Sequence, residues 1–136
     1  MALDPGSGAL WIYGQGRLGR WRPEQGWEVV AEGGDRWFDP GAIVSGLAVG
    51  LDGAPYYILK AQRSWVGRQI ARLDPETRTE TAVSGPGGLV FTGKAGDDSL
   101  GPARCLAFAP NGELVVVDAG TRQVRRASLG SLLPAR

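Results

Sequence analysis

Short apolar runs separated by glycine-containing turns recur along the chain. Each run leads through a polar turn to an apolar-x-Arg element that ends at Arg20, Arg72 or Arg126. The runs are rich in Val, Ile, Trp and Tyr, which suit a pleated sheet. They are also too short, and too often interrupted by Gly and Pro, to form amphipathic helices. The pattern therefore predicts β-strands at residues 10–13, 56–59 and 114–117, each paired with the strand that follows it.

The same unit is repeated along the sequence. Arg20 and Arg72 are 52 positions apart, and Arg126 follows 54 positions later. Each unit also has an apolar segment before its turn and another after its apolar-x-Arg element. These predict first strands at residues 1–3, 46–49 and 105–109, and fourth strands at 27–30, 79–83 and 131–133. Four short antiparallel strands in about 50 residues form one blade of a β-propeller.

The fold class that follows is all-β, with propeller blades of four antiparallel strands. We expect blades at about residues 1–40, 41–92 and 93–136, in one partial propeller domain. Asp52-Gly53 and Asn111-Gly112 predict type I′ hairpin turns, which need positive φ at both residues. Asp4 and Asp74 also neighbour Gly or Pro and are predicted to form turns.

Several side chains are predicted to pack inside this fold. The continuous apolar run 114–117 indicates a strand buried on both faces, and Cys105 is predicted to be buried in the strand before it. Trp11 and Trp21 are predicted to be core residues. The recurrent Arg20, Arg72 and Arg126 are predicted to bond to a neighbouring blade, because one residue type repeats in every unit.

Residues 96–126 resemble an NHL repeat. They contain a Gly96-Asp97 loop, the entry proline Pro102, a strand and turn over 105–112, and a strand ending at Asp118. The usual His or Asn before the last Arg is replaced, since Arg122 and Gln123 stand there. The form with a Gly-Asp loop is similar to repeats of Rhs-type and teneurin-type shells and of bacterial lyase-like propellers. The strong resemblance covers about thirty residues and its outline nearly the whole chain, and such a fold hosts many functions.

Three blades do not close a propeller, which needs about four to eight. An open set would leave an apolar blade face at each end, and soluble monomers rarely expose such faces. Either the chain is a piece of a longer protein, or two copies join about a two-fold axis into a six-bladed ring. The start at Met1 favours assembly, so we expect a homodimer or a larger protein assembly.

Composition excludes several classes of function. The 136 residues include no histidine and one cysteine, which removes Ser-His-Asp and Cys-His catalysis, most zinc sites and an internal disulfide. Net charge is +1, with 15 basic and 14 acidic residues and no basic stripe, so no nucleic-acid partner is expected. No apolar run approaches the roughly 18 residues that cross a bilayer. The N-terminus does not read as a signal peptide, and no compartment is indicated.

Two tryptophans in loops are the candidate binding residues. Trp37 lies beside Arg36, and Trp65 follows shortly after Arg63. Indole faces stack on sugars and other flat ligands, so these four residues are the candidates for a surface that binds a carbohydrate, another small molecule or a partner protein. For both tryptophans, packing in the core is nevertheless favoured over binding.

Three acidic residues are candidate calcium ligands. Asp97 and Asp98 lie in a glycine-rich loop without the alternating acidic pattern of a dedicated calcium loop. In calcium-dependent lactonase propellers, an Asp comparable to Asp118 binds metal, whereas in NHL repeats it braces the following turn. We expect the structural role and no cofactor, with calcium as the alternative.

The sequence thus favours a non-catalytic binding or assembly module. The first alternative is a lactonase-type or lyase-type propeller enzyme, which would need acidic residues converging on the ring axis. Asp52 would have to join the three calcium candidates there. The second alternative is a structural component of a shell or a larger assembly.

Overall fold

The computed structural model describes residues 1–14, 17–32, 43–60, 67–83, 103–118 and 122–128. Within these ranges the chain forms strands and no helix, and no helix suited to crossing a membrane occurs in them. The strands are β1 (Ala2–Leu3), β2 (Leu10–Gly14), β3 (Arg17–Arg22), β4 (Gly26–Glu32), β5 (Ile43–Val49), β6 (Pro55–Lys60), β7 (Gly67–Leu73), β8 (Glu80–Ala82), β9 (Ala103–Phe108), β10 (Leu114–Asp118) and β11 (Gln123–Ala127).

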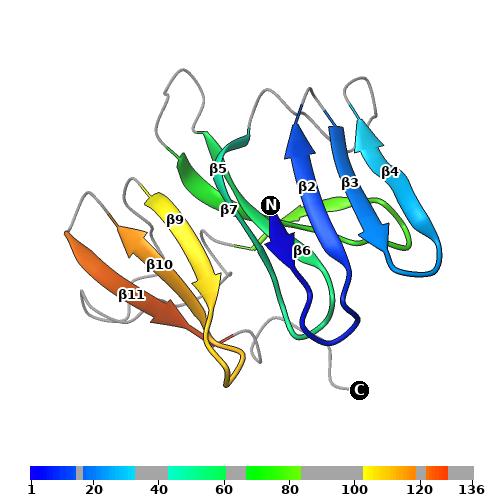
Figure 1. The fold of residues 1–136 in the computed structure, drawn as a ribbon. Helices are drawn as coiled ribbons and strands as arrows, with labels where there is room; N and C mark the ends of the chain where they lie inside the picture. The colour runs from blue at the N-terminus through cyan, green and yellow to red at the C-terminus, as the bar shows by residue number, and fades with distance from the viewer. Residues whose placement is uncertain (15–16, 33–42, 61–66, 84–102, 119–121, 129–136) are drawn as a thin grey trace.

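The strands form three antiparallel sheets in chain order (Figure 1). The first sheet is β1-β2-β3-β4, the middle sheet β5-β6-β7-β8 and the last sheet β9-β10-β11. One residue pair, Gly67 with Ala103, links β7 to β9 and so joins the middle and last sheets. The predicted all-β fold is confirmed, and the predicted strands that fall on described residues are present. The predicted fourth strand at 131–133 lies outside the described residues.

The hairpin turns differ from the predicted type. Gly53 and Gly112 have φ values of 80° and 90°, but the non-glycine residues with positive φ in the described ranges are Arg78 and Arg122. The predicted type I′ turns are therefore wrong. Gly53 N donates to Gly50 O at 2.9 Å, and Gly50 N donates to Ala54 O at 3.0 Å. These bonds enclose a three-residue loop that ends in a left-handed glycine, a common hairpin connection.

Acidic and amide side chains hold these turns as predicted. Asp52 Oδ1 accepts a hydrogen bond from Ala54 N at 3.2 Å, and Asn111 Oδ1 accepts one from Glu113 N at 3.0 Å. Asp74 Oδ1 accepts from Glu76 N at 2.9 Å. Each carboxylate or amide satisfies a backbone donor two residues ahead, which is the Asx-turn arrangement.

The three sheets repeat one arrangement. Gly8, Gly53 and Gly112 all have positive φ and occupy the same place in the turn between the first two strands of a sheet. The residues three positions later are Trp11, Tyr56 and Val115. Each of these pairs across the ladder with one of the recurrent arginines, respectively Arg20, Arg72 and Arg126. The register therefore defines structurally equivalent positions in all three sheets.

Two apolar clusters lie between the sheets. The first contains Trp11 and Leu18 from the first sheet and Tyr57 from the middle sheet. The second contains Tyr56 and Ile58 from the middle sheet, with Leu106, Leu114 and Val116 from the last sheet. The middle sheet is thus buried on both faces, whereas each outer sheet is buried on one. Trp11 is fully buried, as predicted.

Three side chains that were predicted to be buried are exposed, because side chains alternate between the two faces of a strand. Trp21 is 40% exposed and Val117 is 38% exposed, and the thiol of Cys105 is exposed. All three lie on the face of an outer sheet that points away from the middle sheet. Successive residues of a strand point to opposite faces, and the described residues place no further sheet behind these two faces.

The predicted contacts of the recurrent arginines to a neighbouring blade are wrong for Arg20 and Arg72. Arg20 Nη2 lies 2.6 Å from Glu28 Oε1, and Arg72 Nε lies 2.9 Å from Asp52 Oδ2. Both partners belong to the same sheet as the arginine. Arg20 and Glu28 are direct cross-strand neighbours, so the shortest ion pair available is within the sheet. The hydrogen bond from Arg20 holds the pKa of the Glu28 carboxyl below its usual value.

Candidate functional site

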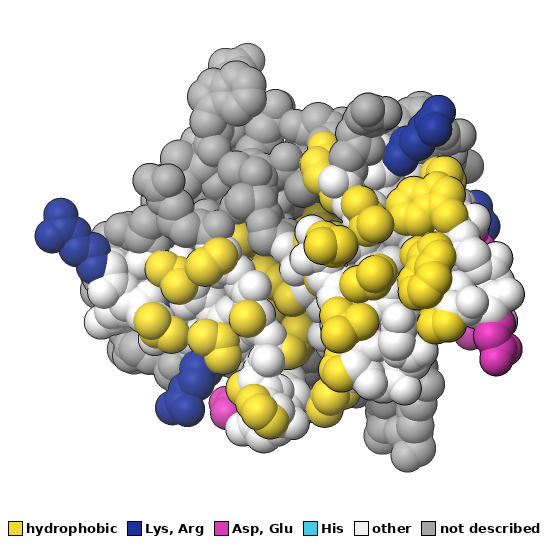
Figure 2. Space-filling model, viewed as in Figure 1, with side chains coloured by type: hydrophobic (Ala, Val, Ile, Leu, Met, Phe, Trp, Pro, Cys, Tyr) yellow, Lys and Arg dark blue, Asp and Glu magenta, His cyan; other side chains and the backbone are white. Residues whose placement is uncertain are grey.

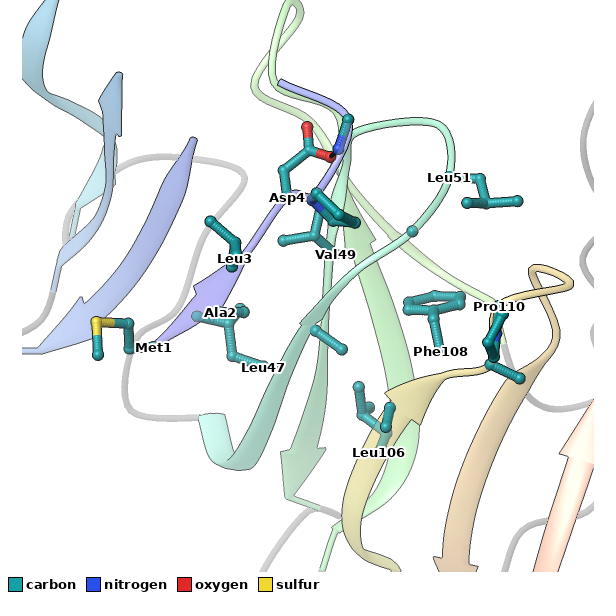
Figure 3. A pocket seen from close by; sticks show the side chains of 16 residues that line it. Met1, Ala2, Leu3, Asp4, Leu47, Val49, Leu51, Leu106, Phe108 and Pro110 are labelled. Carbon is teal, nitrogen blue, oxygen red and sulfur yellow. Dashed lines mark hydrogen bonds between the residues drawn. The ribbon is translucent and has the colours of Figure 1, made fainter. Parts of the chain in front are cut away.

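A groove of about 570 Å³ lies where the first strands of the three sheets meet. β1, β5 and β9 and the turns that follow them form its walls (Figure 3). Ala2 of β1 and Leu47 of β5 lie side by side on one wall, while Leu106 and Phe108 of β9 form the other. Its lining consists of residues 1–6, 47–51 and 106–110.

The lining of this groove is apolar. Its ionisable side chain is Asp4, and both oxygens of that carboxylate serve the local turn. Asp4 Oδ1 accepts from Gly6 N at 3.0 Å, and Oδ2 accepts from Ser7 Oγ at 2.6 Å. Pockets for small molecules combine apolar walls with a few polar groups that fix orientation. The lining offers no pair of groups for acid–base catalysis, so this groove is suited to binding an apolar group.

The outward side of the first sheet carries a continuous apolar surface. The ladder aligns Leu3, Leu10, Trp21 and Trp27 in one row, and Ile12 stands in the next row opposite Gly19. These residues define the first outer face. Leu3 is 57% exposed, Trp27 50% and Ile12 37%. Soluble monomers rarely expose several large apolar side chains together on one sheet.

A glycine shapes this first outer face. A Cβ atom at Gly19 would fall 2.0 Å from Cη2 of Trp27. The indole of Trp27 therefore lies over the backbone of β3 at Gly19, and a larger residue at position 19 would displace it.

The outward side of the last sheet is also apolar. Val117 pairs with Cys105 on one side and with Val124 on the other, and Val115 pairs with Ala107 and Arg126. These residues define the last outer face: Cys105, Ala107, Val115, Val117, Val124 and Arg126. Val124 is 66% exposed. Compared with the first outer face, this one carries smaller side chains and a charge at one edge.

Hydrophobic side chains over the first and last sheets gather on the same side of the molecule (Figure 2). One group lies over β2–β4 and the other over β9–β11.

A buried ion pair lies on the inward side of the last sheet. Arg125 Nη1 donates to Asp118 Oδ2 at 3.1 Å, and the two side chains are 2% and 0% exposed. The candidate calcium ligand Asp118 therefore has a guanidinium partner. The described part of the chain contains no cluster of three or more His, Cys, Asp or Glu residues that could hold a metal ion.

The other predicted site residues cannot be placed. Arg36, Trp37, Arg63, Trp65, Asp97 and Asp98 lie outside the described residues. Among the described residues, the tryptophans that reach the surface are Trp21 and Trp27. The exposure of Trp21 follows from the hairpin register. Trp21 pairs with Leu10, and Leu10 and Trp11 are successive residues that point to opposite faces of the strand.

Two tyrosine hydroxyls are buried against carboxylates in the middle sheet. Tyr57 Oη donates to Glu80 Oε1 at 2.6 Å, and Tyr56 Oη donates to Asp52 Oδ2 at 3.0 Å. Burial, reinforced by the neighbouring carboxylates, raises the pKa of both hydroxyls above the usual value. Each hydroxyl favours its neutral form in the folded protein.

These shifts predict a loss of stability at alkaline pH. A tyrosine in the unfolded chain has a pKa of about 10, so the folded state holds both protons more tightly. The free energy of unfolding should be steady below pH 10 and should fall as the pH rises from there toward the folded pKa values. Urea titrations from pH 7 to 11 measure this slope. Tyr57→Phe should reduce the slope and cost about 1 kcal/mol at pH 7; an unchanged slope in the Tyr56→Phe/Tyr57→Phe variant would contradict the assignment.

Comparisons with known proteins add no family. No protein-family model matches the sequence, and no curated protein matches it significantly.

Proposed function

We propose that this protein is a non-catalytic binding and assembly module of the β-propeller type, whose ring is completed by another chain. The observation that carries the proposal is the pair of apolar outer faces on one side of the molecule. A chain with both faces in water would expose aromatic and aliphatic side chains at each end. Covering these side chains stabilises the assembled form by about 25 cal/mol for each Å² of apolar surface removed from water.

The repeated sheets support the propeller type. Each sheet begins at the groove, and successive strands step outward by antiparallel pairing. The first strands of consecutive sheets contact one another, β1 with β5 and β5 with β9. Radial sheets around a common centre are the arrangement of propeller blades. Three such sheets form part of a ring, and the groove lies where its centre would be.

The groove is the proposed ligand site of the completed ring. Its apolar lining favours a small molecule with an apolar part, and a carbohydrate would need polar partners from residues beyond this lining. An enzyme of the lactonase or lyase type would need free carboxylates on the axis. Asp52 and Asp118 are each bonded to an arginine, Arg72 and Arg125, and so do not favour that function.

The reactivity of Cys105 tests whether the last outer face is covered. The chain has a single thiol, and it is exposed on that face. We expect labelling by a maleimide dye to slow as protein concentration rises, because assembly covers the face. Glu24→Cys in a Cys105→Ser background places the thiol on the exposed β3–β4 turn and should react at one rate throughout. A folded protein whose Cys105 reacts as fast as this control at every concentration would refute the proposal.

A further inference from the structure

We infer that the chain completing the ring is a second copy, and that the first outer face of each copy packs on the last outer face of the other. This inference rests on the proposed function and adds the identity of the partner and the pairing of the faces. Each copy then contributes two different patches, and the pair closes about a two-fold axis.

Structurally equivalent positions in the three sheets indicate which faces pack together. Trp11 and Tyr56 occupy the same position in the first and middle sheets, and both are buried against the sheet that follows in the chain. Val115 is the third member of this set. It lies on the last outer face, where the described residues place no following sheet. The last outer face is therefore equivalent to the faces that pack forward onto a next sheet.

The residue after each of these positions points toward the preceding sheet. Tyr57 and Val116 follow Tyr56 and Val115, and each is buried against the preceding sheet. Ile12 follows Trp11 and is 37% exposed on the first outer face. The first outer face is therefore equivalent to the faces that receive a preceding sheet. The free ends of the molecule are the two halves of an interface that the chain already forms twice.

The sizes of the side chains agree with this pairing. The first outer face presents large residues, Trp21, Trp27 and Ile12, whereas the last outer face presents smaller ones, Ala107, Val115 and Val117. Large groups against small ones fill an interface without voids. Pairing two first outer faces would instead oppose tryptophans to tryptophans and would leave both last outer faces in water.

The position of the two faces selects a closed pair. Both apolar groups appear on one side of the molecule (Figure 2), so one partner rotated by a two-fold axis covers both at once. Two copies supply six sheets, within the range of about four to eight blades in which propellers close. A partner of another sequence would have to present equivalents of both the first and the last outer face in the same geometry. A second copy has both.

Cross-linking between chosen thiols tests the pairing. Wild-type protein, with Cys105 on the last outer face, is mixed with an Ile12→Cys/Cys105→Ser variant, whose thiol is on the first outer face. A short bis-maleimide can react with a thiol whenever a pair dissociates and, once the pair re-forms, should give a covalent dimer in the mixture and none from either protein alone. Wild-type protein mixed with Glu24→Cys/Cys105→Ser is the matched control and should remain uncross-linked. Circular dichroism and light scattering confirm that each variant folds and assembles.

The outcomes separate this inference from the proposed function. A dimer in which each protein cross-links to itself, or in which no combination cross-links, overturns the inference but leaves assembly standing. A folded monomer overturns both. The Ile12→Cys variant in the wild-type background carries both thiols and distinguishes a closed ring of two copies from an open-ended polymer. It should stop at a covalent dimer, and a ladder of longer species would contradict closure.

Discussion

Asp118→Ala is expected to destabilise the fold by about 3–5 kcal/mol, because it removes the carboxylate from a buried ion pair with Arg125. Both side chains are almost fully buried on the inward side of the last sheet. The guanidinium would lose this ion pair in a buried setting and could not regain its hydration without opening the contact with the middle sheet. Urea unfolding followed by circular dichroism at pH 7 measures the loss.

A double variant separates loss of the ion pair from loss of packing. Asp118→Leu/Arg125→Met replaces both charges with apolar groups and should recover most of the stability, since buried ion pairs exchange for hydrophobic pairs at little net cost. Asp118→Asn, which keeps the shape but removes the charge, should fall between the two. An Asp118→Ala variant within about 1 kcal/mol of wild type would show that water or another group supports Arg125.

Trp27→Glu and Val124→Glu are each expected to abolish assembly while leaving the chain folded. Both side chains are at least half exposed in the single chain, at 50% and 66%, so the fold tolerates a carboxylate at either position. In the assembled form the same carboxylate would be buried without a partner. That cost is several kcal/mol, which weakens association on the order of a hundredfold or more.

Either substitution alone should suffice, because every contact between copies uses one first outer face and one last outer face. Thr81→Glu introduces the same charge at an exposed position of β8 in the middle sheet, and it should assemble like wild type. Sedimentation velocity over a range of concentrations distinguishes these cases. Normal assembly of Trp27→Glu would remove the first outer face from the interface.

The strands and their order could be predicted from the sequence because they depend on local information. Short β-rich runs bounded by Gly and Pro specify hairpins, and hairpins bring neighbouring strands together. The turn type depended on finer detail. Asp52-Gly53 is compatible with a two-residue or a three-residue loop, and the bond from Gly50 N to Ala54 O selects the longer one.

Burial at the two ends could not be predicted in the same way. Alternation indicates that Cys105 and Leu106 point to opposite faces, but it does not show whether another sheet stands behind each face. In the single chain Leu106 meets the middle sheet and Cys105 does not. The run 114–117 reads as buried on both faces for the same reason, and this reading applies to the assembled form that we propose.

The candidate groove was also hidden from sequence reasoning. Its walls come from three segments separated by about one repeat each, and none carries a binding motif. Only the convergence of β1, β5 and β9 brings Ala2, Leu47 and Leu106 to one cavity. Arg20 was misassigned because its nearest carboxylate depends on the register of β3 with β4, which the repeat does not reveal.

Light scattering coupled to size-exclusion chromatography measures the mass of the assembled protein in solution. We expect a folded species of twice 14.4 kDa for the wild-type protein and a species of single mass for Trp27→Glu. A wild-type protein that elutes at 14.4 kDa at every concentration and unfolds cooperatively would contradict assembly through the two outer faces.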